Sequence, residues 1–283
     1  MIANLNETKK ILAKYDLQAK KKFGQNFLID SNIINKIIEE SKIDKNCGVI
    51  EIGPGIGSLT EKLSESAKKV LCYEIDEDMI EILKDNIKTN NVKIIKQDFL
   101  KADLSKELDY FSDCENIKVV SNLPYYITTP IIFKLLEEKN EINDFYFMVQ
   151  KEVGQRLTGK KNSKDYNSLS VAIDFQANAR ICFFVGRNCF YPAPNVDSVI
   201  INIQKEQKNY DIDNQKDFLR FVQNIFQLRR KTFVNNVSSQ YHINKEEVIK
   251  LLEKRGYKPT IRSEELSTAE IVTLYKDFLL TNE

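Results

Sequence analysis

The sequence predicts an α/β protein with a doubly wound, mostly parallel sheet, followed by a small all-helical C-terminal domain. Between residues 48 and 150, short apolar runs alternate with helical patterns, as in parallel strands joined by helices. Beyond a polar stretch at 205–216, the apolar residues recur at helical spacing. A chain of 283 residues is long enough for one large and one small domain, which we place at 1–207 and 208–283.

The elements of the first domain follow from the spacing of apolar residues. Asp30 precedes isoleucines at helical spacing and predicts a capped amphipathic helix. The predicted parallel strands are 48–52, 69–75, 92–98, 117–122 and 144–150, and the predicted helices between them are 58–66, 77–88 and 130–138. Three further β segments, 168–175, 179–185 and 198–203, are expected to form an antiparallel edge.

Helix signals dominate the C-terminal domain. Phe218, Phe221 and Ile225 fall on one helix face. Asn244 with Glu247, and Ser267 with Glu270, have the spacing of a capping box. The sequence therefore predicts several helices packed around an apolar core.

Composition narrows the classes of function. No apolar run is long enough to span a bilayer, and residues 1–15 lack a signal-peptide pattern, so we expect a cytoplasmic protein. The five cysteines form no C-x-x-C pair and are expected to be reduced. One histidine leaves little basis for zinc, haem or Ser-His-Asp chemistry, and we expect no metal. No coiled coil or dimer surface is evident, so a monomer is expected.

Positive charge is concentrated in two segments, although the whole chain carries only +1. Residues 1–22 carry +4, and residues 215–265 carry eleven Lys or Arg against six acids. This distribution suits a polyanionic partner, although a solvated lysine-rich surface is the alternative. Arg229, Arg230 and Lys231 are predicted to contact RNA phosphates rather than form a solvated helix end.

Three consecutive strand ends offer groups for a cofactor. EIGPGIG at 51–57 follows a strand, and Gly53 and Gly55 would let the backbone approach a ligand closely, although a structural turn would also explain them. Glu74 ends the next strand, at the position of an acid that binds ribose hydroxyls, and Asp98 ends the third, where a carboxylate can accept from an adenine amino group. Together they predict S-adenosylmethionine. No P-loop lysine is present for a triphosphate.

The stretch SNLPYY at 121–126 ends the fourth strand, beside this predicted cofactor site. A plain turn would explain it, but it also carries chemistry for an adenine. The N6 lone pair of adenine is delocalised into the ring and is freed if both N–H groups donate to fixed oxygens. The Asn122 side chain and the Leu123 carbonyl, stiffened by Pro124, are predicted to be those oxygens, with Asn122 also at the cofactor site. Tyr125 offers a ring to stack on the base.

Together with these strand ends, longer stretches make the chain resemble the rRNA adenine N6-dimethyltransferase family, in its small-subunit (16S) branch. The stretches are KKKFGQNFLID (20–30), QKEVGQRL (150–157), YNSLSV (166–171), FYPAPNVDS (190–198), LRRKTFVNN (228–236) and RSEELS (262–267). The resemblance spans residues 18–270. It departs from the family pattern at Tyr191 and at Phe233, where a smaller residue and a leucine are usual, and neither position has a proposed chemical role.

The resemblance implies a Rossmann-like class I methyltransferase fold, and further roles for single residues. Asn26 and Leu28 would touch the cofactor, and Phe190 would stack on the target adenine opposite Tyr125. Phe190 could also be a core aromatic, which the residue by itself favours. The implied substrate is a pair of adjacent adenosines near the 3′ end of small-subunit rRNA, in an immature ribosomal subunit. Each would be converted to N6,N6-dimethyladenosine during ribosome biogenesis.

Two other functions stay open on the sequence. A large-subunit rRNA adenine N6-methyltransferase of the antibiotic-resistance kind would use the same strand-end groups for its cofactor and target adenine. The stretches GQNFL, YNSLSV and RSEELS argue against this function. A non-catalytic ribosome-assembly factor on a methyltransferase scaffold is the third possibility. The intact Asn122, Pro124 and Tyr125 argue against that reading.

Overall fold

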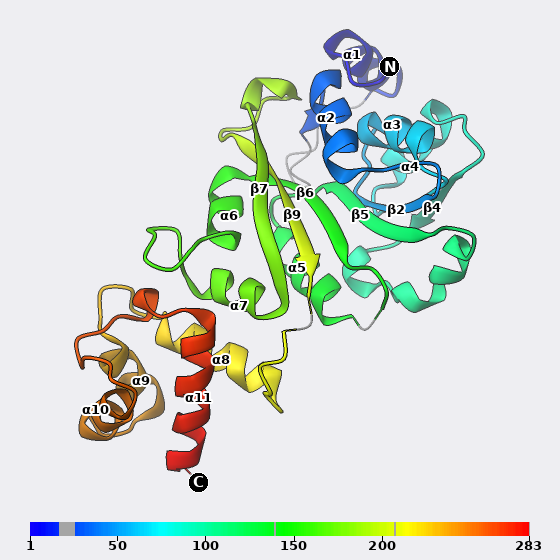
Figure 1. Cartoon of the computed structure of the whole chain (residues 1–283). Coiled ribbons are helices and arrows are strands. Elements are labelled where there is room, and N and C mark those ends of the chain that lie inside the picture. The colour runs from blue at the N-terminus through cyan, green and yellow to red at the C-terminus, as the bar shows by residue number, and fades with distance from the viewer. Residues whose placement is uncertain (17–25, 139, 207, 283) are drawn as a thin grey trace. The chain divides into compact units, whose positions relative to one another are not determined.

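The computed structural model describes residues 1–16, 26–138, 140–206 and 208–282 (Figure 1). Its chain divides into two compact units, Met1–Gly154 with Arg180–Lys205, and Gln155–Ala179 with Glu206–Glu283. The first is an α/β unit and the second is helical, which confirms the predicted fold class. The chain crosses between the units at 205/206, close to the predicted boundary, but residues 155–179 group with the helical unit. None of the helices in the described ranges is long and apolar enough to cross a membrane.

A seven-stranded sheet forms the centre of the first unit, in the order β4-β3-β2-β5-β6-β9-β7. Its strands are β2 (Cys47–Ile52), β3 (Lys69–Glu74), β4 (Val92–Lys96), β5 (Asn116–Asn122), β6 (Asp144–Gln150), β7 (Ala177–Val185) and β9 (Ser198–Lys205). The first five strands of this order pair in parallel, and β9 runs antiparallel to β6. The expected antiparallel contribution near one edge is therefore present.

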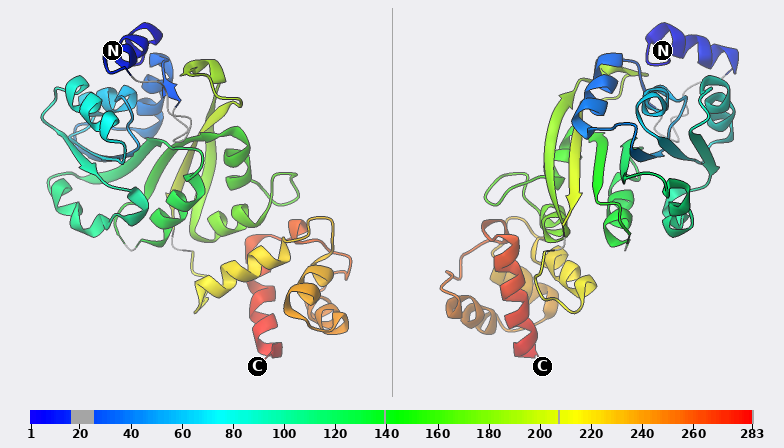
Figure 2. Two further views of the ribbon diagram at one scale, coloured as in Figure 1. Left: turned by 180° about the vertical axis from the view of Figure 1, so that it is seen from behind. Right: turned by 45° about the vertical axis from the view of Figure 1, so that its right-hand side comes forward.

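Helices cover both faces of the sheet, as the right-hand view of Figure 2 shows. The helices of this part of the chain are α1 (Leu5–Lys14), α2 (Ser31–Ser41), α3 (Ser58–Ser66), α4 (Glu77–Asn86), α5 (Thr128–Glu137) and α6 (Lys151–Leu157). Asp30 caps α2 as predicted, since its side chain accepts from the Asn32 amide. Because both faces are covered, every residue of β2 is buried, in keeping with its run of mostly apolar residues.

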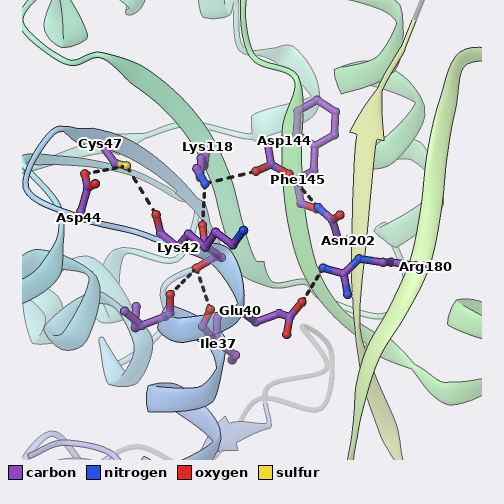
Figure 3. Close-up of polar contacts among 12 residues, drawn as sticks. Ile37, Glu40, Lys42, Asp44, Cys47, Lys118, Asp144, Phe145, Arg180 and Asn202 are labelled. Atoms are coloured by element: carbon purple, nitrogen blue, oxygen red, sulfur yellow. Dashed lines mark hydrogen bonds and ion pairs between the residues drawn. The ribbon is translucent and has the colours of Figure 1, made fainter.

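Polar contacts join neighbouring elements where β5 and β6 begin (Figure 3). The Lys118 ammonium on β5 donates to the Ser41 carbonyl at 2.6 Å and lies 3.3 Å from the Asp144 carboxylate on β6. Asp144 also accepts from the Asn202 side chain on β9 at 2.7 Å. Arg180 on β7 pairs with Glu40 of α2. These contacts fix the amino edge of the sheet, and the opposite, carboxyl edge is where parallel strands of this fold bind ligands.

The second unit packs its helices around an aromatic-rich core. Its helices are α7 (Ser168–Gln176), α8 (Gln215–Ile225), α9 (Phe233–Tyr241), α10 (Lys245–Lys254) and α11 (Thr268–Asn282). Phe218, Phe221 and Ile225 are fully buried on one face of α8, as their spacing predicts. Ser267 and Glu270 form the predicted capping box at the start of α11, with the Ser267 amide donating to the Glu270 carboxylate at 2.6 Å.

One predicted strand is wrong: residues 168–175 form the helix α7 rather than a β segment. Asn167 begins this helix by accepting from the Leu169 amide, and Ser170 completes a capping box. Buried residues occur around most of the helix, so its apolar pattern shows little helical periodicity and can be mistaken for that of a buried strand. The neighbouring stretch QKEVGQRL is also mostly helical, as α6.

Candidate active site

A pocket of about 340 Å³ lies at the carboxyl edge of the sheet. Its walls come from the ends of β2, β3, β4 and β5, together with β1 (Phe27–Leu28). The volume falls in the range of small-molecule sites, roughly 300–1,000 Å³. The residues predicted for cofactor and base binding that line it are Asn26, Leu28, Gly53, Gly55, Glu74, Asp98, Asn122, Leu123, Pro124 and Tyr125. Segments far apart in sequence therefore meet in one cavity.

The glycine-rich loop after β2 forms one side of the pocket. Gly53, Gly55 and Gly57 have φ angles of +69°, +57° and +94°, a region that L side chains rarely adopt. A Cβ added to Gly53 would lie 3.5 Å from the ring of Pro124, so the loop passes directly beside the NLPY stretch. The glycines are needed for this backbone path, which brings main-chain atoms to the surface of the pocket.

Glu74 holds the loop and faces the pocket. Its carboxylate accepts from the Gly55 amide at 3.2 Å and from the Ile75 and Asp76 amides at 2.8 and 3.0 Å. Burial raises the pKa of Glu74, and the backbone donors oppose that shift. Each carboxylate oxygen can accept more than one hydrogen bond, so the group can still accept from a ligand hydroxyl.

Asp98 ends the loop after β4 and begins a short 3₁₀ helix, Phe99–Lys101. One carboxylate oxygen, Oδ1, accepts from the Leu100 amide at 3.0 Å. This turn fixes the side chain at the pocket wall, where its other oxygen can accept from an amino group.

Asn122 is the last residue of β5, and its side chain lines the pocket. The side-chain nitrogen Nδ2 of Asn122 donates to the Asn26 carbonyl at 3.3 Å. This hydrogen bond fixes the orientation of the side chain and leaves its oxygen Oδ1 available as an acceptor. The next backbone amide, of Leu123, donates to the Met148 carbonyl on β6 at 3.2 Å. The start of the NLPY stretch is thus anchored to the neighbouring strand.

Pro124 and Tyr125 turn the chain from β5 into α5. The Pro124 carbonyl accepts from the Ile127 amide at 3.2 Å and from the Thr128 hydroxyl at 3.1 Å. Tyr125 is half-buried, and its hydroxyl lies 2.9 Å from the Ser198 hydroxyl at the start of β9. This contact fixes the phenol ring at the pocket wall, and burial raises its pKa.

Phe190 does not line the pocket. It lies in β8 (Phe190–Tyr191), which pairs with β1 so that Phe190 faces Leu28 across the ladder. Its side chain is buried in the apolar core of the first unit. The ladder connects Phe190 to the pocket wall through Leu28, but the predicted stacking on an adenine stays a prediction. The stretch 17–25, which includes the first half of the KKKFGQNFLID motif, lies outside the described residues.

Glu51 is a pocket residue that the sequence reasoning did not single out. It lies on β2, is 2% exposed, and accepts from the Thr60 hydroxyl at 2.6 Å. Burial raises its pKa to about 8, although Thr60 and Cys72 donate to it. An acidic residue within an otherwise apolar strand is itself a signal, because carboxylates are rarely buried without a reason.

Two buried hydroxyls at the pocket, those of Ser58 and Tyr73, have no hydrogen-bond partner in the described chain. Buried polar atoms without partners carry a free-energy cost unless a ligand or water satisfies them. The pocket therefore presents acids from three strands, a glycine loop and unsatisfied hydroxyls around a cavity of ligand size. These donors and acceptors fit S-adenosylmethionine, which carries an amino-acid tail, a ribose and an adenine.

The predicted RNA-binding residues lie in the other unit. Arg229, Arg230 and Lys231 occupy an exposed loop between α8 and α9, rather than a helix end. Arg229 donates to the Lys164 carbonyl, so part of its charge also holds the loop in place. Within the described ranges, no cluster of three His, Cys, Asp or Glu side chains could hold a metal ion.

Comparison with known proteins identifies the relatives of this chain. Residues 16–278 match the family described as ribosomal RNA adenine dimethylase. Ribosomal RNA small subunit methyltransferase A from Bacillus mycoides is 44% identical, covering 99% of this chain and 98% of that protein. The protein of that name from Staphylococcus epidermidis is 43% identical, covering 97% of this chain and 95% of that one.

Solved structures agree with the fold. A dimethyladenosine transferase from Plasmodium falciparum has a TM-score of 0.72 at 25% identity, covering 89% of this chain and 97% of that chain. The 23S rRNA methyltransferase ErmE has a TM-score of 0.67 at 23% identity, covering 89% and 98%, and it supports the fold alone.

Proposed function

Because the chain belongs to the ribosomal RNA adenine dimethylase family and is an S-adenosylmethionine-dependent rRNA adenine dimethyltransferase, we propose that its target is two adjacent adenosines near the 3′ end of small-subunit rRNA. Each adenosine would be methylated twice at N6. One observation supports the site assignment most directly. The NLPY stretch shares a single pocket with the glycine loop and the strand-end acids Glu74 and Asp98.

The first role of the pocket is to hold the methyl donor. S-adenosylmethionine, when bound, supplies an electrophilic methyl group on a sulfonium. Glu74 would accept from the ribose hydroxyls and Asp98 from the adenine amino group. The glycine loop, held by Glu74 through the Gly55 amide, would approach the amino-acid tail closely.

The second role is to activate the target amine. Asn122 Oδ1 and the Leu123 carbonyl would accept hydrogen bonds from the two N6 N–H groups, so that the nitrogen becomes pyramidal and its lone pair points away from the ring. Tyr125, held by Ser198, would stack on the extruded base. The methylated N6 is positively charged, and its proton is acidic enough to leave to water, so the chain need supply no strong base. Catalysis would consist of positioning and fixed hydrogen-bond acceptors.

The setting of the reaction is also part of the proposal. We assign the substrate to a partly assembled small ribosomal subunit, with the enzyme acting as a monomer in the cytoplasm. The basic loop at Arg229–Lys231 supports a polyanionic partner. All three side chains are exposed, so they are accessible to rRNA phosphates.

Substitution of Asn122 tests the site. We expect Asn122→Ala to lower the methylation rate on immature small subunits by about two orders of magnitude or more, because one of two fixed acceptors is lost. Cofactor affinity, measured by calorimetry, should change far less. Methyl transfer is measured with labelled cofactor, followed by mass spectrometry of the rRNA nucleosides.

A matched control is Asn90→Ala, which removes an exposed asparagine remote from the pocket and should leave the rate unchanged. An Asn122→Ala enzyme that dimethylates adenosine at the parental rate would remove Asn122 from the mechanism. The assay includes large-subunit rRNA, and methylation there instead of on small subunits would contradict the proposed substrate.

A further inference from the structure

An exposed phenylalanine stands at the end of the edge strand β7. Phe184 is 58% exposed, whereas its neighbours Phe183 and Val185 are buried, so the alternation of the strand turns its ring to solvent. The ring therefore lies outside the core of the first unit and is accessible to a ligand. Its surroundings indicate what it could bind.

One cation lies over the ring, and a second follows it closely in the sequence. The Lys151 ammonium, at the start of α6, lies over the Phe184 ring at 5.4 Å from its centroid. Arg187 follows three residues after Phe184 and is also exposed. Val196, 44% exposed, lies in the bend just before β9. We call these four residues, Lys151, Phe184, Arg187 and Val196, the Phe184 patch.

Backbone hydrogen bonds attach the patch to the active site. The Lys151 amide donates to the Asp197 carbonyl at 2.9 Å, and the Arg187 amide donates to the Asp197 carboxylate at 3.1 Å. The next residue, Ser198, is the hydroxyl partner of Tyr125 at 2.9 Å. Asp197, which accepts from both amides, directly precedes the residue that fixes the predicted stacking tyrosine.

The register of the sheet places the patch on the same edge as the pocket. Asn122 on β5 pairs with Met148 on β6, and two residues further along β6, Gln150 pairs with Ser198 on β9. Lys151 directly follows Gln150, so it lies just beyond the end of the strand beside Asn122. The patch therefore extends the carboxyl edge of the sheet outward from the NLPY stretch.

We propose that the Phe184 patch binds a single-stranded RNA nucleotide that flanks the target adenosine, an inference that rests on the proposed function. The base would stack on Phe184, and Lys151 and Arg187 would neutralise its phosphate. An exposed ring with adjacent cations is the chemistry of single-strand binding surfaces, where each base contributes by stacking and each phosphate by charge.

A double-mutant cycle tests this proposal. The probe is a short single-stranded RNA that carries the target adenosine pair, prepared intact and with an abasic nucleotide at each flanking position in turn. We expect Phe184→Ala to weaken binding of the intact RNA about five- to 150-fold, the range for one stacked base. One abasic position should weaken binding to the parental protein by a similar factor, yet have little further effect on the Phe184→Ala protein.

Three comparisons make the result specific. Phe184→Tyr keeps a ring and should retain binding, whereas Lys151→Gln with Arg187→Gln should reduce the salt dependence of binding. Leu5→Ala, a truncation of another exposed apolar residue, should have no effect. The proposal would be overturned if Phe184→Ala left the affinity for the intact RNA unchanged. It would also be overturned if, at every flanking position, the loss of affinity from the abasic nucleotide were the same in the parental and the Phe184→Ala proteins. Weakened binding to ribosomal subunits with unchanged binding to the RNA would assign the patch to a protein partner instead.

The same measurements separate this inference from the proposed function. If the parental enzyme methylates small-subunit rRNA but Phe184→Ala matches it in RNA affinity and KM, only the patch is refuted. If the parental enzyme does not methylate rRNA adenosines at all, the proposed function fails, whatever the patch binds.

Discussion

Glu51 shows how one buried side chain can matter both for stability and for the cofactor pocket. Its carboxyl group is buried on the central strand β2, beside Thr60 and Cys72, and it lines the cavity. Desolvation disfavours the charged form, and burial raises its pKa to about 8. Near neutral pH the group is therefore predominantly protonated in the folded protein and ionised in the unfolded chain.

The pH dependence of stability follows from this difference. Between the usual pKa near 4.5 and about 8, folding takes up a proton at Glu51, so its contribution to stability falls as pH rises through this window. We expect the Glu51→Gln protein to have an unfolding free energy similar to that of the parental protein at pH 5, and a higher one than the parental protein at pH 8. Each tenfold change in proton affinity corresponds to about 1.4 kcal/mol, so the gain should be on the order of a few kcal/mol.

Denaturant unfolding of the two cofactor-free proteins, at pH 5, 6.5 and 8, measures this effect. Glu65→Gln, an exposed acid on α3, serves as the control and should shift stability little at any pH. A difference between Glu51→Gln and the parent that does not grow with pH would mean that Glu51 is ionised when buried.

At the scale of single elements, the start of α11 depends on its capping box. Glu270 accepts from the Ser267 amide and hydroxyl, and its carboxylate lies 2.7 Å from the Lys161 ammonium. Burial raises the pKa of Glu270. The hydrogen bonds from Lys161 and Ser267 together outweigh burial and lower this pKa to about 2. The ionised carboxylate is therefore the form that stabilises this helix.

We expect Glu270→Ala to lower the unfolding free energy by about 1 kcal/mol at pH 7, a typical cost for a lost cap. The pKa of Glu270 is lower in the folded protein than in the unfolded chain, where it is near 4.5. The carboxylate therefore stabilises the fold above pH 4.5, and this stabilisation is lost as the pH falls toward 2. The difference from the parent should therefore shrink in acid. Chemical unfolding at pH 7, 4 and 3 measures it, with Glu253→Ala on α10 as the exposed control. A loss that stays constant across this range would argue against the ionised cap.

For the molecule as a whole, the uneven charge distribution is the property most directly tied to its substrate. The chain is nearly neutral, yet the basic loop Arg229–Lys231 is exposed. Binding of phosphates by such side chains releases counterions and makes affinity fall with salt.

Neutralising Arg229, Arg230 and Lys231 together, each to Gln, should weaken binding to immature small subunits. The slope of log affinity against log salt concentration should also become less steep by about two units. Each lost phosphate contact accounts for roughly 0.7–0.9 units of this slope. Filter binding across a series of salt concentrations measures the slope. Replacing two exposed lysines of the other unit, Lys88 and Lys106, by Gln provides the control. A slope equal to that of the parent would remove the loop from the interface.

Much of this description was predictable from the sequence because the signals are local. The strands 48–52 and 144–150, the helix capped by Asp30 and the box of Ser267 with Glu270 each follow from patterns within a few residues. The strand-end rule then predicts that Gly53, Glu74, Asp98 and Asn122 meet at one edge, because parallel strands share a direction. The helix α7 was missed because a segment buried on most sides does not show its period.

Sequence alone determined the alternation of strands and helices between residues 48 and 150, the sheet class and the set of strand-end groups that suit the cofactor. The tertiary structure decided what depends on packing between distant segments. These features are the contact of the Tyr125 and Ser198 hydroxyls, the hydrogen bond from the Asn122 side chain to the Asn26 carbonyl, the burial of Phe190 in the core, and the raised pKa of Glu51. Short-range spacing encodes backbone geometry. Burial and contacts across 70 or more residues arise only when the sheet and its helices assemble.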